Sequence, residues 1–189
     1  MKFEYILNGI GWADVKMYID GKKYYSFPSY ISEPLIDLCE GLLSIIPDCV
    51  SDDELKLISC FKWFQEPSID KWTIRLMDNS KLKILIEHFE HESSDKGEIE
   101  FEGACGLIDF LKEVTKSLEA LLNKHGFIGY KDTWYGQDFP FSSYLKLKYY
   151  LISKGAFPTS EEPNVYGVEV FKSNLQDEIN ILLENIGNV

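Results

Sequence analysis

The segment Glu98-Ile99-Glu100-Phe101-Glu102 alternates charged and apolar residues more regularly than any other stretch of this 189-residue chain. Successive side chains of a β-strand point to opposite faces, so this alternation predicts a strand with one wet face and one buried face. Such a strand is typical of an antiparallel sheet, because the strands of parallel sheets are usually buried on both faces. The segment therefore indicates a protein built around antiparallel strands.

Helical periodicity follows directly on the C-terminal side of this strand. Apolar residues from Leu107 to Leu122 recur on a single helix face, and Gly126 stands where a helix commonly ends. These features predict a helix over residues 107–125. The next segment, Phe127–Pro140, is aromatic and rich in glycine, and we expect a loop or a short strand there.

The same two periodicities locate the other elements. Asn8-Gly9 and Asp20-Gly21 are hairpin-turn signals, and they separate three alternating segments that predict an N-terminal meander. Further strands are expected near 72–76 and 82–86, ahead of residues 98–102. Further helices are expected at 33–46, 142–154 and 173–186.

Strands and helices do not alternate regularly in this order, which favours an α+β fold over a doubly wound α/β fold. We expect a single domain with an antiparallel sheet of about six strands, packed on one face against three to four helices. Residues 1–155 would form its core. Residues 156–189 would be a C-terminal extension packed on the same domain, with a linker at 156–164, an edge strand at Val165–Phe171 and the last helix.

Composition limits the class of protein. Hydrophobic residues make up 45% of the chain, enough for a core, and no apolar run is long enough to cross a membrane. The N-terminus lacks the apolar centre and cleavage site of a signal peptide, so we expect a cytoplasmic protein. Reduced thiols are then expected at the four cysteines, which are Cys39, Cys49, Cys60 and Cys105.

Charge narrows the range of partners. Thirty-one acidic residues against nineteen basic ones give a net charge of −12, and Arg75 is the only arginine. Such a chain repels a phosphate backbone and lacks the residue best suited to clamp one, which argues against nucleic-acid binding. The acidity could steer a basic protein partner to the surface; alternatively, the net charge only keeps the protein in solution, which is the commoner role of such charge in an acidic domain.

One enzymatic hypothesis rests on Cys105, which lies between a predicted strand and a predicted helix. The dipole at a helix N-terminus lowers the pKa of a thiol, and His88 is a candidate base on a strand that could lie alongside. The chain would then be a small cofactor-free hydrolase or transferase. Alternatively, Cys105 is a small residue packed where a strand meets a helix.

We expect neither a metal nor a cofactor. His88 and His91 share a face only on a helix, whereas the preceding residues alternate like a strand. Several carboxylates lie beside aromatic residues, an arrangement found in sugar sites and equally in wet loops around anchoring aromatics. These carboxylates are Glu66, Asp70, Asp132 and Asp138.

The acidic segment itself is a candidate interface. Glu98, Glu100 and Glu102 should share one strand face, where their mutual repulsion suits either a basic partner or protection of a sheet edge against aggregation. Trp134 and Tyr135 are the best candidates for hydrophobic anchors, because tryptophan and tyrosine dominate binding hot spots.

Several short motifs resemble a recurring pattern in bacterial proteins. They lie between about residue 3 and residue 152 and comprise Gly11-Trp12-Ala13, Ser29-Tyr30-Ile31-Ser32, Glu66-Pro67 followed by Trp72, Gly126-Phe127 with Gly129-Tyr130, Trp134, and Phe139-Pro140 with Tyr144. The pattern is similar to that of a family of small acidic proteins that resemble immunity proteins of polymorphic toxin systems. This resemblance implies neutralisation of a toxin by binding, and it implies no catalytic residue.

Overall fold

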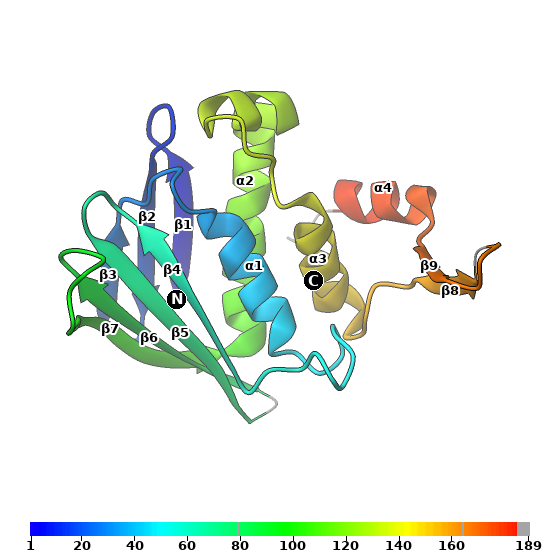
Figure 1. The fold of residues 1–189 in the computed structure, drawn as a ribbon, viewed down its shortest axis with the longest axis horizontal. Helices are drawn as coiled ribbons and strands as arrows, with labels where there is room; N and C mark the ends of the chain where they lie inside the picture. The colour runs from blue at the N-terminus through cyan, green and yellow to red at the C-terminus, as the bar shows by residue number, and fades with distance from the viewer. Residues whose placement is uncertain (79, 164, 185–189) are drawn as a thin grey trace.

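The computed structural model describes residues 1–78, 80–163 and 165–184 (Figure 1). Within them, four helices and nine strands form an α+β fold in which every strand pairing is antiparallel, which confirms the predicted fold class. The core is continuous across the two larger sheets and three of the helices.

The first sheet is the predicted N-terminal meander, in the order β1 (Lys2–Leu7), β2 (Ala13–Ile19) and β3 (Lys22–Ser26). Its turn at Asp20-Gly21 places both residues at positive φ, as a tight hairpin turn requires. Alternate residues are buried along all three strands, so the sheet has one inner face and one outer face.

The second sheet has the order β4 (Ile58–Phe64), β5 (Ile69–Asp78), β6 (Lys81–Phe89) and β7 (Glu98–Gly106). Where about six strands in one sheet were expected, the structure has two sheets of three and four strands. Their inner faces pack together, with the ring centroids of Tyr24 and Trp72 5.4 Å apart. Periodicity specifies which face of a strand is buried but not which strand lies beside it, so it could not reveal this division.

Helices cover the outer edges of both sheets. On α2 (Leu107–Thr133), the Ser117 hydroxyl accepts a buried hydrogen bond of 2.7 Å from the backbone N–H of Tyr5 on the edge of β1. The edge of β4 is covered by α1 (Pro34–Ser44) and by the segment before it, where the N–H of Ser29 donates to the Phe64 carbonyl. Backbone groups of edge strands are thereby satisfied inside the molecule.

α2 is longer than predicted. It runs straight to Gly126, whose φ of 62° and ψ of 179° interrupt the helix, as the sequence suggested. The chain then resumes a helical path to Thr133 instead of forming the predicted loop or short strand. Tyr130 and Trp134 explain the difference, since residues four apart share a helix face and both rings are buried. α3 (Phe141–Ser153) follows close to its predicted bounds.

The C-terminal extension differs from its predicted layout. Part of the expected linker forms β8 (Ser160–Pro163), which pairs only with β9 (Glu169–Lys172), so the hairpin projects from the body (Figure 1). The last helix, α4 (Leu175–Leu183), packs against α3, and Ile181 and Leu182 contact the core. Residues 185–189, the end of the predicted helix among them, lie outside the described residues.

Within the described ranges, no helix combines the length and the apolar character that are needed to cross a bilayer.

Candidate functional site

The two residues of the enzymatic hypothesis are far apart. β6 and β7 are neighbours, as expected, but the register places Cys105 opposite Leu82 and His88 opposite Glu98. Leu82 and His88 are six positions apart, which corresponds to about 20 Å along a strand. Cys105 and His88 therefore form no nucleophile–base pair.

The Cys105 thiol is also not activated. Cys105 is the second-last residue of β7 and not part of the first turn of α2, and burial together with the Asp109 carboxylate raises its pKa to about 11. The expectation of a lowered pKa is thus wrong. A thiol that is protonated at neutral pH is a poor nucleophile, so the structure favours the alternative in which Cys105 is a packing residue.

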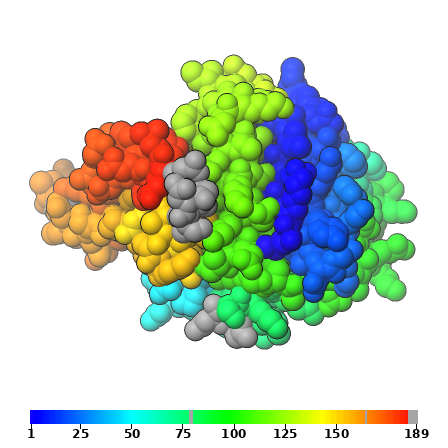
Figure 2. Space-filling model, turned by 180° about the vertical axis from the view of Figure 1, so that it is seen from behind, coloured from blue at the N-terminus to red at the C-terminus, as the bar shows by residue number. Residues whose placement is uncertain are grey.

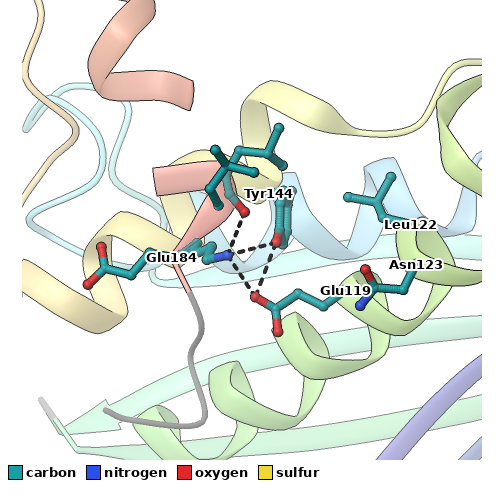
Figure 3. Close-up of a pocket in the computed structure, with 8 residues that line it drawn as sticks. Glu119, Leu122, Asn123, Tyr144 and Glu184 are labelled. Atoms are coloured by element: carbon teal, nitrogen blue, oxygen red, sulfur yellow. Dashed lines mark hydrogen bonds and ion pairs between the residues drawn. The ribbon is translucent and has the colours of Figure 1, made fainter. Parts of the chain in front are cut away.

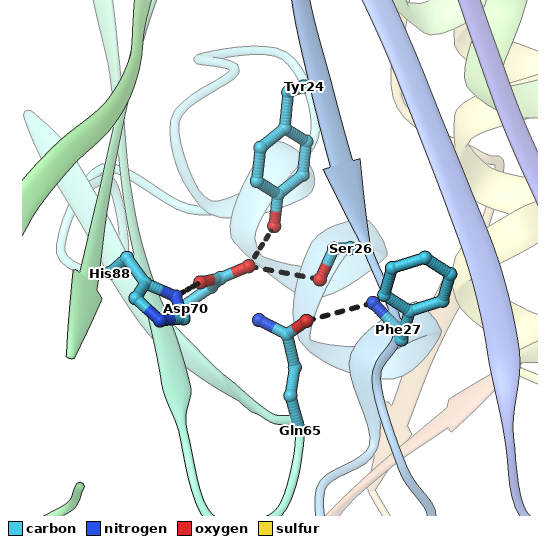
Figure 4. Close-up of polar contacts among 6 residues, drawn as sticks. All are labelled: Tyr24, Ser26, Phe27, Gln65, Asp70 and His88. Carbon is cyan, nitrogen blue, oxygen red and sulfur yellow. Dashed lines mark hydrogen bonds and ion pairs between the residues drawn. The ribbon is translucent and has the colours of Figure 1, made fainter. Parts of the chain in front are cut away.

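His88 instead belongs to a polar cluster between the sheets (Figure 4). Its Nδ1 lies 2.8 Å from Oδ1 of Asp70, the neighbouring residue on β5, and Asp70 is only 1% exposed. The hydroxyls of Tyr24 and Ser26, both on β3, donate hydrogen bonds to the other carboxylate oxygen. One buried carboxylate therefore ties β3 to β6 across β5.

This cluster was only partly visible in the sequence. Asp70 was considered in the sequence only as an acid near Trp72. The alternation of β5 indicates more, because it places Asp70 on the same buried face as Trp72 and Ile74. A charged residue at a buried position of a strand needs hydrogen-bond donors inside the protein. Those donors come from distant strands, and their identity could not be inferred before the fold was known.

His91 lies in the exposed loop after β6, away from the His88 contact. Across the described residues, no group of three or more histidine, cysteine, aspartate or glutamate side chains is arranged to hold a metal ion.

A second buried charge lies under the C-terminal extension (Figure 3). Lys148 is 1% exposed, and its Nζ donates to Glu119 at 2.7 Å, to the Tyr144 hydroxyl at 3.2 Å and to the Leu182 carbonyl at 3.1 Å. A cavity of about 330 Å³ adjoins this group. The last contact joins α4 to α3, so Lys148 helps to hold the extension against the rest of the molecule. Lys148 was not predicted from the sequence as a functional or structural residue.

The row of acids Glu98, Glu100 and Glu102 is less regular in the structure than the strict alternation of the sequence predicts. A β-bulge places Phe101 opposite Ile86 and Ile99 opposite Glu87, so that Glu100 is the extra residue. Ile99 is consequently 65% exposed between Glu98 and Glu100. The three glutamates therefore do not form one evenly spaced line.

Glu102 also differs from the other two acids of the row. Its carboxylate lies 2.7 Å from Lys83 Nζ, and this contact lowers the pKa of Glu102. Glu98 and Glu100 form no ion pair with any residue that the structure describes. The uncompensated negative charge thus lies at the beginning of β7.

The two predicted anchors have opposite environments. Trp134 is 1% exposed, and its Nε1 donates to Gln137, so it is a core residue and not a surface anchor. Tyr135 is 62% exposed and stacks on Tyr30, with ring centroids 4.2 Å apart. Of the pair, only Tyr135 is available to a partner.

Antiparallel connectivity brings the loop containing Tyr135 together with four others. The turns after β1, β3, β4 and β6 and the turn after α2 all lie at the end of the sheets opposite the β5–β6 turn (Figure 1). We call this surface the loop end; it comprises residues 8–12, 27–33, 65–68, 90–97 and 134–140. It includes most of the short motifs that the sequence analysis quoted. Its exposed apolar side chains are Ile10, Trp12, Phe27, Ile31 and Tyr135.

Hydrogen bonds between distant segments link four of these five loops, at residues 8–12, 27–33, 65–68 and 134–140. The N–H of Gly11 donates to the Thr133 carbonyl at 2.7 Å, and the N–H of Tyr30 donates to the Gly11 carbonyl at 2.9 Å. Gln137 Nε2 donates to the Tyr30 carbonyl, and Gln65 accepts from the N–H of Phe27. The loop end is therefore a preorganised surface, which lowers the entropic cost of binding.

Gly11 is required at this junction. Its φ is +75°, and a Cβ there would lie 2.7 Å from the Tyr30 ring. Any larger residue would displace Tyr30, against which Tyr135 stacks.

Exposed acids lie in the loops of the loop end or within two residues of them, and Lys96 is the basic residue of the β6–β7 loop. These acids are Glu33, Glu66, Glu90, Glu92, Asp95, Asp132 and Glu98. The surface as a whole therefore combines apolar anchors with negative charge.

Comparisons of the chain with protein-family models, curated proteins and solved structures found no match.

Proposed function

We propose that this chain is a protein-binding module that engages a basic partner through the loop end. The observation that carries the proposal is the group of exposed apolar side chains at the loop end, held on cross-linked loops with acids in or next to the loops. Interfaces commonly combine a few aromatic anchors with a polar rim of complementary charge. Tyr135 and Trp12 would be the anchors, and Glu98 and Glu100 would steer the partner.

The finer form of the proposal is an immunity protein that neutralises a basic toxin in the bacterial cytoplasm. It is supported by the resemblance of the sequence motifs, most of which meet at the loop end. Such an inhibitor acts by occupying a surface of the toxin, so it needs rigid contact groups rather than catalytic ones. The raised pKa of Cys105 and its separation from His88 agree with this role.

The product of the gene adjacent to this one is the partner to test, by co-expression for relief of toxicity and by surface plasmon resonance for binding. Replacing Trp12 with Ala and Tyr135 with Asn should raise the dissociation rate at least roughly tenfold, because hot-spot aromatics each contribute about 2 kcal/mol or more. Asparagine suits position 135, where φ is 56°.

The charge variant Glu98→Gln/Glu100→Gln/Glu102→Gln should slow association and flatten its dependence on salt. A matched control removes three acids from the extension by Glu161→Gln/Glu169→Gln/Glu178→Gln, and it should leave association nearly unchanged. If the two charge variants behave alike, the acids of β7 do not steer the partner. If the neighbouring product neither binds nor is neutralised, the immunity role is wrong.

A further inference from the structure

The outer face of the β1–β2–β3 sheet carries lysine and tyrosine side chains in alternate cross-strand positions. Tyr18 on β2 lies between Lys2 on β1 and Lys23 on β3. The neighbouring row consists of Glu4, Lys16 and Tyr25. Residues directly opposite each other in an antiparallel pair have Cβ atoms about 5 Å apart, so each tyrosine side chain has a lysine side chain as its cross-strand neighbour.

This face is open to solvent. Tyr18 is 43% exposed and Tyr25 is 53% exposed, and the two rows border a shallow depression of about 190 Å³. From behind, the blue N-terminal strands reach the surface beside α2, and no other segment lies over them in that view (Figure 2). A rigid sheet therefore presents two aromatic rings without a covering element.

The sign of the charge here is opposite to that of the molecule. Lys2 pairs with Glu4 at 2.7 Å, whereas Lys16 and Lys23 form no ion pair within the described part of the chain. In a chain with a net charge of −12, this is a locally positive surface. Edge protection does not explain it, because Lys16 lies on the central strand of the sheet. Strand propensity explains tyrosine on a sheet but not the lysines around it.

We propose that this tyrosine–lysine face (Lys2, Lys16, Tyr18, Lys23 and Tyr25) binds an acidic polypeptide segment. Ammonium groups complement glutamate and aspartate, and tyrosine hydroxyls donate hydrogen bonds to carboxylates. Tyrosine rings also give contact area at low cost in side-chain entropy. A nucleic-acid strand is less favoured, because arginine is the residue best suited to clamp phosphate and the only arginine of the chain, Arg75, lies on β5 and not on this face. The proposal is independent of the loop end, which carries the opposite charge.

The test uses the intact chain and a fluorescein-labelled dodecamer of glutamate, with binding followed by fluorescence anisotropy. Binding should weaken about fivefold or more between 50 and 200 mM NaCl, because screening acts on the exposed charges. Tyr18→Thr/Tyr25→Thr removes both rings but places a good strand former at each position, and it should weaken binding at least roughly fivefold. Lys16→Gln/Lys23→Gln should weaken it by about tenfold.

The matched control is Lys96→Gln/Lys124→Gln, which removes the same charge from other surfaces and should bind the peptide like the parent chain. Circular dichroism verifies that each variant is folded. Equal losses in the control and in Lys16→Gln/Lys23→Gln would show diffuse electrostatics and overturn the proposal, as would full binding by the tyrosine variant or no binding by the parent chain. A labelled dodecathymidylate that binds as tightly as the peptide would assign the face to nucleic acid instead.

Discussion

At position 70 a carboxylate occupies a place that apolar side chains fill elsewhere on the inner face of β5. It is tolerated because Tyr24, Ser26 and His88 supply hydrogen-bonding groups from two other strands. A buried polar network that is fully satisfied specifies one arrangement of its strands. Here it fixes the end of the two sheets that supports the loop end, since Ser26 directly precedes Phe27.

Asp70→Asn should destabilise the protein by about 2–3 kcal/mol, because hydrogen bonds to a charged group are lost and buried partners are left poorly matched. Urea unfolding followed by tryptophan fluorescence measures the change. The control is Asp138→Asn, whose exposed carboxylate pairs with Lys131 and should contribute less than about 1 kcal/mol. Equal effects of the two substitutions would contradict the role of Asp70 in holding β3, β5 and β6 together.

At the scale of elements, α1 carries a different kind of electrostatic cost. Burial raises the pKa of Asp37 from 3.8 to about 6, with further contributions from Glu33, the N-cap residue of α1, and from Glu40. A helix dipole favours an acid in the first turn, yet the direction of the shift shows that burial and like-charge repulsion outweigh it. Asp37 therefore opposes folding whenever it is ionised.

The sign of the pH dependence follows from the raised pKa. The folded protein takes up a proton at Asp37 as the pH falls from about 6 to about 4, where the unfolded chain remains ionised, so the cost is full above pH 6 and vanishes near pH 4. Asp37→Asn should then stabilise the protein by about 1 kcal/mol at pH 8, after allowance for solvent screening, and by little at pH 4. Thermal unfolding at both pH values measures this. Asp132→Asn is the control and should show no such difference; a gain at pH 4 as large as that at pH 8 would refute the assignment.

Elements were predictable where apolar residues recur with a single clear period, as in the strands β5 and β6 and in the first part of the helix α2. The bulge in β7 was not, because the order Glu98-Ile99-Glu100 is the same whether Ile99 points inward or outward. The helical turn after Gly126 was missed because local glycines favour a loop, while burial of Tyr130 and Trp134 overrides that preference. That helical turn also determines which of the two candidate anchors is buried and which is exposed, namely Trp134 and Tyr135 respectively.

At the scale of the whole molecule, the loop end results from strand direction. Antiparallel strands place alternate connections at the same end, so the convergence of residues 8–12, 27–33, 65–68 and 90–97 follows once the strand order is known. Some of these segments share the resemblance described above, but their proximity in space could not be predicted from the sequence. The division into two sheets and the projecting hairpin could not be predicted from the sequence either, because both depend on contacts between distant residues.

The extension contributes little to the core of this molecule. Only Ile181 and Leu182 of residues 165–184 pack against it, and both are partly exposed. Lys148 would lose the Leu182 carbonyl on removal of the extension but would keep Glu119 and Tyr144. Its charge would remain paired, so no uncompensated buried ion would result.

A chain that ends at residue 155 should therefore still unfold in one cooperative transition, with a free energy of unfolding lower by no more than about 2 kcal/mol. Near-UV circular dichroism and urea titration measure both properties. Leu118→Ala in the intact chain provides the scale, because Leu118 is 1% exposed and its truncation should cost about 2–5 kcal/mol. A shortened chain that loses its near-UV signal, or that is destabilised more than Leu118→Ala, would show that α4 is part of the core, with Lys148 as its essential attachment.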